Sequence, residues 1–195
     1  MNIHDFVGEK IFNPIKSKNV PNLKEQWDQV RKVRDKGHTL LSVDRRKMMT
    51  FTQLYYVPGL TTVCGISGVP VLTGFMSGCY LFRYRDNGAL YAAHVGTHDT
   101  NQKANDKAKA AWKNHIAQAH ITDVFGYDPA RDVSLGLIQQ AAKIGAPNVF
   151  GMWEGNGGVR VGIIARHQDN SWTLVGVEAV PLRPWSSIQN DPKMR

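Results

Sequence analysis

The 195-residue sequence has little cysteine, no long apolar run and a shortage of acidic side chains. Its two cysteines are too few for a disulfide scaffold, and no His/Cys spacing repeats the paired-ligand pattern of a structural zinc site. No window approaches the roughly 18 uninterrupted apolar residues of a transmembrane helix. The charged N-terminus shows no apolar signal-peptide core, so a protein that leaves its cell would need a specialised secretion route.

Basic side chains dominate the charge balance. Lys and Arg number 24 against 16 Asp and Glu, which gives a formal charge of +8 and predicts attraction to acidic partners. Hydrophobic residues make up 42% of the chain, enough for the core of one compact domain. We therefore expect a single domain over residues 1–195, with residues 181–195 as a poorly ordered, flexible tail.

Short β-prone runs separated by turn signals fill most of the chain. Residues 39–97 contain six of them, and three more follow at 148–153, 159–166 and 173–180. Amphipathic helices are expected at 21–36, at about 101–120 and at 129–143. This order predicts an α+β fold with a mostly antiparallel, two-layer β-sandwich core flanked by about three helices.

Asn87-Gly88 lies between two β-prone runs and predicts a tight hairpin, because both residues of a type I′ turn need positive φ. A two-residue turn places Leu81 opposite His94. Since side chains alternate along a strand, Cys79, Leu81 and His94 would then share one face. A three-residue loop would instead send Cys79 and His94 to opposite faces.

In the two-residue register, Cys79 and His94 are diagonal neighbours with α-carbons roughly 7 to 8 Å apart. A thiol has an ordinary pKa of about 8.5, so it is mostly protonated near neutrality. A neighbouring imidazole can remove that proton and form the nucleophilic thiolate. The hairpin therefore predicts a nucleophile and a general base built from one local segment.

The segment before the cysteine adds two further features. Gly74 and Gly78 allow a tight turn in which the backbone amide of Cys79 can point at a substrate oxygen. Thr73 can reach back over this turn and orient the imidazole, as third members of catalytic triads do. The predicted site residues are Cys79, His94 and Thr73, with Gly78 and Ser77 in the oxyanion turn.

Residues 73–97 resemble the cysteine deamidase toxins and their relatives: the cytotoxic necrotizing factors, the Burkholderia lethal factor and the bacterial chemoreceptor glutamine deamidases. Their shared signature is an LSGC-like nucleophile loop, a threonine six residues before the cysteine in several branches, and a histidine a dozen or more residues after it. Here Met76–Cys79 matches the loop with methionine in place of leucine. Thr73 stands six residues before Cys79, and His94 stands fifteen after it.

The resemblance implies conversion of a protein glutamine to glutamate, with no cofactor, on a two-layer β-sandwich. It assigns Cys79 as nucleophile, His94 as general base and Thr73 as orienting group, although a backbone carbonyl orients the histidine in the necrotizing-factor branch. The partner would be a protein with a reactive glutamine, such as a small GTPase or a translation factor. We expect a monomeric effector or toxin that acts in a target-cell cytoplasm and requires no nucleic acid.

Two other functions stay open. An amine that intercepts the thioester in place of water would make the same site a transglutaminase. A dense set of basic side chains also suits a non-enzymatic binding module for an acidic protein, anionic lipid or nucleic acid, with Cys79 structural. This basic set comprises Lys16, Lys18, Arg31, Arg34, Arg45, Arg46 and Lys47.

Cys79, His94, His98 and Asp99 also offer a metal-ligand set, but an i,i+4 histidine pair works on a helix and this run is β-like. Cys64 is not accompanied by a base or a glycine-framed turn of this kind, and it is expected in the core. Residues 153–158 lack the Lys and Ser/Thr of a phosphate loop and are expected to form a hairpin turn.

Overall fold

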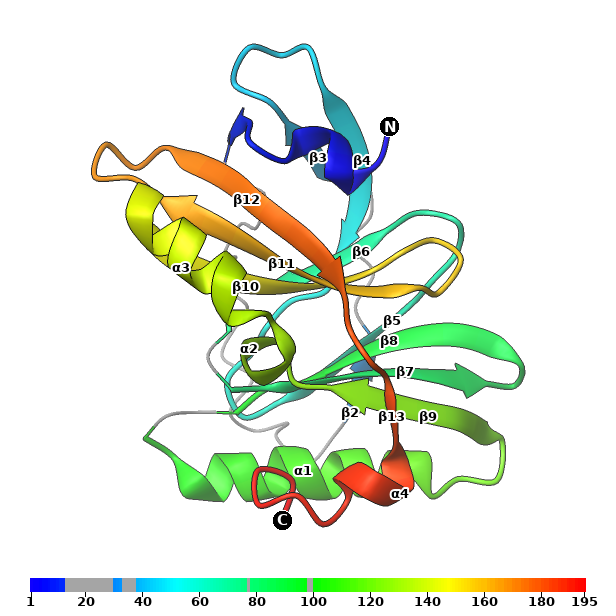
Figure 1. The fold of residues 1–195 in the computed structure, drawn as a ribbon. Helices are drawn as coiled ribbons and strands as arrows, with labels where there is room; N and C mark the ends of the chain where they lie inside the picture. Colours follow the sequence, from blue (N-terminus) through cyan, green and yellow to red (C-terminus); the bar gives the residue numbers. More distant parts are fainter. Residues whose placement is uncertain (13–29, 33–37, 77, 98–99) are drawn as a thin grey trace.

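The computed structural model describes residues 1–12, 30–32, 38–76, 78–97 and 100–195, which form two β-sheets with helices packed around them (Figure 1). The first sheet has seven strands, in spatial order β1 (Lys10–Ile11), β12 (Trp172–Ala179), β11 (Val159–Arg166), β10 (Ala146–Trp153), β6 (Val71–Gly74), β4 (Met48–Gln53) and β3 (His38–Leu41). The second has six, in the order β13 (Arg183–Pro184), β9 (Ile121–Tyr127), β7 (Tyr80–Asp86), β8 (Ala89–Val95), β5 (Thr61–Gly65) and β2 (Val30–Lys32).

Most strand pairs are antiparallel, but each sheet contains a parallel pair. Strand β4 runs parallel to β6, and β2 runs parallel to β5. Between β4 and β6 the chain crosses to the second sheet to form β5 and then returns, so β6 re-enters the first sheet in the direction of β4. The α+β class is as expected. The mostly antiparallel two-layer sandwich is met only in part, because the sheets are mixed and do not form a plain antiparallel sandwich.

The helices differ from the sequence prediction in two places. Within the described ranges they are the 3-10 helix η1 (Ile3–Phe6), α1 (Gln102–Ile116), α2 (Pro129–Asp132), α3 (Leu135–Ile144) and α4 (Trp185–Ile188). The helix predicted at 129–143 is interrupted where Val133 and Ser134 take extended conformations, and Ser134 caps α3. The helix predicted at 21–36 is wrong at residues 30–32, which form β2, and its other residues lie outside the described ranges.

The hydrophobic core forms three layers. Between the sheets, Leu81 of β7 and Trp153 of β10 belong to one cluster, and α3 packs against it. On the outer side of the second sheet, Trp112 of α1 packs against Tyr84 with ring centroids 5.5 Å apart. A third cluster lies on the outer side of the first sheet, where Phe6 of η1 is buried. In Figure 1, α1 lies along the second sheet and η1 beside the first.

The hairpin register predicted from Asn87-Gly88 is confirmed. Leu81 pairs with His94, and both turn residues have positive φ, 50° at Asn87 and 80° at Gly88. Strand β9, which the sequence analysis did not predict, pairs with β7 on its other side and makes β7 an interior strand of the sheet.

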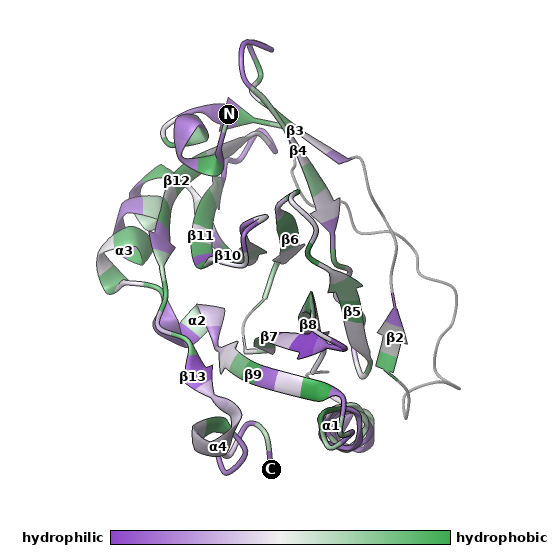
Figure 2. Ribbon diagram, turned by 90° about the vertical axis from the view of Figure 1, so that its right-hand side faces the viewer, coloured by the Kyte–Doolittle hydropathy of each residue, from purple (hydrophilic) through white to green (hydrophobic). Residues whose placement is uncertain are grey.

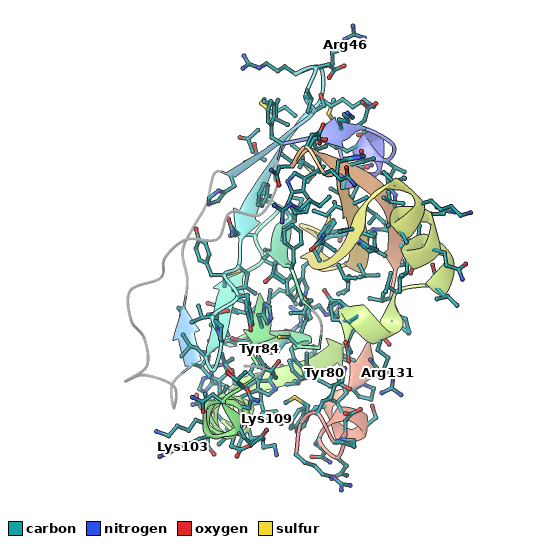
Figure 3. The ribbon with its side chains drawn as sticks, turned by 90° about the vertical axis from the view of Figure 1, so that its left-hand side faces the viewer. Arg46, Tyr80, Tyr84, Lys103, Lys109 and Arg131 are labelled. Carbon is teal, nitrogen blue, oxygen red and sulfur yellow. The ribbon has the colours of Figure 1, made fainter. Side chains whose placement is uncertain are left out.

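The C-terminal segment 181–195 is packed against the second sheet, in contrast to the poorly ordered tail expected. The hydroxyl of Tyr80 donates to the Asp191 carboxylate at 2.9 Å, and the Lys109 ammonium donates to the carbonyl of Arg195 at 3.0 Å. Met194 is 1% exposed. Figure 3 shows Tyr80 and Lys109 in the lower part of the molecule, near this segment.

The fit between the sheets predicts that Gly151→Ala destabilises the fold. A Cβ at Gly151 would lie 2.0 Å from Cδ1 of Leu81 and 2.8 Å from the Tyr127 hydroxyl. We expect the free energy of unfolding to fall by about 1–3 kcal/mol, measured by urea denaturation, because overpacking forces neighbours to shift. Gly136→Ala is the control, since its Cβ would meet nothing within 4 Å. Equal stability of Gly151→Ala and the wild type would contradict this prediction.

Candidate active site

His94 occupies an interior position in the second sheet. Its strand β8 lies between β7 and β5, where His94 pairs with Leu81 on one side and Thr62 on the other. The side chain points into the space between the sheets and is fully buried. Neighbouring strands thus fix the backbone of the predicted base on both sides.

Thr73 contacts His94 from the opposite sheet. Thr73 lies on β6, and its Oγ1 is 2.7 Å from Nδ1 of the imidazole. Figure 1 shows β6 and β8 in the two different sheets, so this hydrogen bond joins them. When Nδ1 carries the proton and donates it to Thr73, Nε2 keeps its lone pair and can act as a base.

Burial keeps His94 neutral. Desolvation lowers the pKa of His94 to about 3, because burial penalises the charged imidazolium. Its Nε2 has no hydrogen-bond partner among the described residues. An unpartnered buried nitrogen calls for an explanation, and a role in proton transfer is one that fits an imidazole. The site therefore contains a neutral imidazole with one nitrogen held and the other available.

Cys79 lies immediately before β7, on the face of the hairpin that carries Leu81 and His94. It is 4% exposed, and its Sγ is 3.3 Å from Oγ1 of Thr97. Cys64 lies in the same core cluster as Cys79, as expected for a core residue, and burial raises its pKa to about 12. A thiol with that pKa is protonated at neutral pH and inert.

The predicted oxyanion turn is described only in part. Ser77 lies outside the described residues, and Gly78 is half-buried. A Cβ at Gly78 would lie 3.8 Å from the Lys193 ammonium, which forms an ion pair with the buried carboxylate of Asp128. The C-terminal segment therefore places a cation beside the residue that precedes Cys79, a contact that sequence reasoning missed.

Tyr56 is a second residue that sequence reasoning missed. Its ring lies 5.2 Å from the imidazole of His94, with 31° between the ring planes. Its hydroxyl donates to the carbonyl oxygen of Thr97 at 2.6 Å. The only local signal was an aromatic residue before the Pro58-Gly59 turn, and nothing in that pattern indicates pairing of the neighbouring β5 with β8.

The other predicted groupings are separated or lie partly outside the described residues. His98 and Asp99 of the alternative metal set lie outside them. Among the residues described, no three His, Cys, Asp or Glu side chains are grouped as metal ligands, and no helix is long and apolar enough to cross a membrane. Residues 154–158 form the turn between β10 and β11, as expected.

The basic set is represented mainly by one hairpin tip. Arg45, Arg46 and Lys47 follow β3, and this tip is mainly hydrophilic in Figure 2. In Figure 3, Arg46 lies at the opposite end of the molecule from Tyr80. Lys16, Lys18 and Arg34 lie outside the described residues.

Comparison with known proteins adds no assignment. No protein-family model matches the chain, and no curated protein matches it. The resemblance to cysteine deamidases therefore depends on the sequence of residues 73–97.

The lowered pKa of His94 predicts a pH-dependent stability. The ordinary histidine pKa is 6.5, and that of folded His94 is about 3. Between these two pH values His94 is protonated in the unfolded chain and neutral in the folded protein. The free energy of unfolding should therefore fall as the pH drops through this window, by on the order of 1 kcal/mol per pH unit. Urea denaturation at pH 7 and pH 5 should show a smaller loss in His94→Gln than in the wild type. Equal losses in both proteins would contradict the prediction.

Proposed function

We propose that the protein is a cysteine-dependent glutamine deamidase that converts a glutamine side chain of a target protein to glutamate. The observation that carries the proposal is the inter-sheet contact between Thr73 and His94 at 2.7 Å, which holds Nδ1 and leaves Nε2 without a partner among the described residues. Cys79 lies on the same face of the hairpin as this base. A held, neutral base on the same face of the hairpin as a thiol suits nucleophilic catalysis.

In the proposed reaction, Nε2 of His94 accepts the thiol proton as the Cys79 sulfur attacks the carboxamide carbon of glutamine. Backbone amides around Gly78 and Cys79 stabilise the resulting oxyanion. The imidazolium returns the proton to the amide nitrogen, the C–N bond breaks, and ammonia leaves a thioester behind. Water then attacks the thioester carbon, His94 takes its proton, and the S–C bond breaks to give glutamate and the thiol.

Burial of His94 fits this sequence of proton transfers. Because its pKa is lowered to about 3, the imidazole of His94 is uncharged at neutral pH before the substrate reacts. Proton transfer would therefore accompany the attack on the substrate. The same low pKa makes the imidazolium a strong acid toward the leaving nitrogen and the neutral imidazole a weak base toward the thiol, so the proposal requires transfer of the thiol proton to be concerted with the attack.

The wider setting is proposed from the resemblance. The target would be a protein with a reactive glutamine, of the small-GTPase or translation-factor kind, and the protein would act as an effector in a target-cell cytoplasm. If an amine replaces water, the thioester yields a transglutamination product. The alternative is a non-enzymatic binding module that uses the basic side chains and leaves Cys79 structural.

A proteome-wide modification experiment tests the activity without a known target. Protein extract is incubated with the wild type, Cys79→Ser, His94→Ala or the control Cys64→Ser, and glutamine-to-glutamate conversion and ammonia release are measured by mass spectrometry and a coupled assay. We expect conversion with the wild type and Cys64→Ser and background levels with the other two, since a serine hydroxyl is far less acidic than a thiol. Full conversion by Cys79→Ser would overturn the deamidase proposal.

Thr73→Val tests the orienting hydrogen bond. Valine is nearly isosteric with threonine but can neither donate to nor accept from Nδ1 of His94. We expect the turnover rate of Thr73→Val to be about ten- to a hundredfold lower than that of the wild type. This corresponds to a rise of about 1–3 kcal/mol in the activation free energy. Thr73→Ser keeps the hydroxyl and should retain most activity. Full activity in Thr73→Val would mean that another group, such as a backbone carbonyl, holds the imidazole.

A further inference from the structure

Tyr56 and Thr97 connect the two predicted catalytic side chains from outside the Cys-His-Thr set. The Tyr56 ring packs over the imidazole of His94 with a centroid distance of 5.2 Å. Its hydroxyl donates to the backbone carbonyl of Thr97 at 2.6 Å. The Thr97 hydroxyl in turn lies 3.3 Å from the sulfur of Cys79. One chain of contacts therefore runs from the base to the nucleophile.

The backbone around Tyr56 is fixed against the end of β8. The amide of Gly59 donates to the carbonyl of Gly96 at 2.9 Å, and the amide of Gly96 donates to the carbonyl of Leu60 at 3.0 Å. A Cβ at Gly96 would lie 2.2 Å from the carbonyl oxygen of Val57. Glycine at this position therefore permits the close approach that brings Tyr56 over His94.

We propose that Tyr56 and Thr97 are positioning residues for the reaction of Cys79 and His94, an inference that rests on the proposed function. A hydrogen bond from Thr73 fixes Nδ1, but an imidazole held at one atom can still tilt. The Tyr56 ring fixes the plane of the imidazole and so the direction of Nε2. The Thr97 hydroxyl holds the sulfur and can donate to the thiolate that forms during the attack.

The test uses four substitutions that separate ring packing from hydrogen bonding. Tyr56→Phe keeps the ring and loses the link to Thr97, whereas Tyr56→Leu loses both. Thr97→Val removes the hydroxyl near Cys79, and Thr97→Ser restores it. Tyr91→Phe is the matched control. Tyr91 lies on β8, as His94 does, but its ring stacks on Tyr84 on the other face of the sheet.

Two measurements follow each variant. The rate of Cys79 alkylation by iodoacetamide is recorded against pH by peptide mass spectrometry, and the ring nitrogens of His94 are observed by NMR in nitrogen-15-labelled protein. We expect Tyr56→Leu to shift the His94 signals and to change the alkylation rate roughly tenfold. Tyr56→Phe should preserve the His94 signals, and Thr97→Val should alter the pH profile of Cys79, with Thr97→Ser close to wild type.

The outcomes separate the two proposals. Unchanged His94 signals and an unchanged Cys79 pH profile in folded Tyr56→Leu and Thr97→Val would overturn the positioning role. If Tyr56→Leu does not fold, Thr97→Val and Tyr56→Phe decide the question with the same two readouts. A wild type that converts no glutamine, while these substitutions still change His94 and Cys79, would overturn the deamidase and leave the coupling of the two side chains supported.

Discussion

The hydrogen bond between Thr73 and His94 joins the inner faces of the two sheets, and the candidate site depends on it. It forms only when the sheets lie at one separation and in one register. Gly151 pairs directly with Thr73, and its lack of a side chain makes room for Leu81 of the facing sheet. The packing that closes the core therefore also brings the imidazole to its orienting hydroxyl.

The parts of the site that the sequence predicted are those that local geometry determines. The Asn87-Gly88 turn sets the hairpin register, and strand alternation then places Cys79 and His94 on one face. The contact of Thr73 with His94 is a different case, because it crosses between the sheets and depends on how they pack. Tyr56 could not be found in this way, because its position depends on β5 pairing with β8 and on the close contact of its loop with Gly96.

The errors in the fold have a related cause. Residues 30–32 fit a helical apolar spacing, yet they form a strand because β5 offers a parallel edge, a partner that local periodicity does not reveal. The segment 181–195 lacks periodic apolar residues, so it was expected to be flexible. It is held instead by scattered long-range contacts, such as those of Asp191 with Tyr80 and of Arg195 with Lys109.

The contacts of Lys193 with Asp128 and beside Gly78 affect when the site can assemble during synthesis. The hairpin with Cys79 and His94 leaves the ribosome well before β10, which pairs with β6 and Thr73, and before the segment that carries Lys193. A nascent chain thus carries Thr73, Cys79 and His94 before the strand that pairs with β6 and the lysine beside Gly78 have been made. The surroundings of Cys79 and His94 are therefore complete only when most of the chain has been translated.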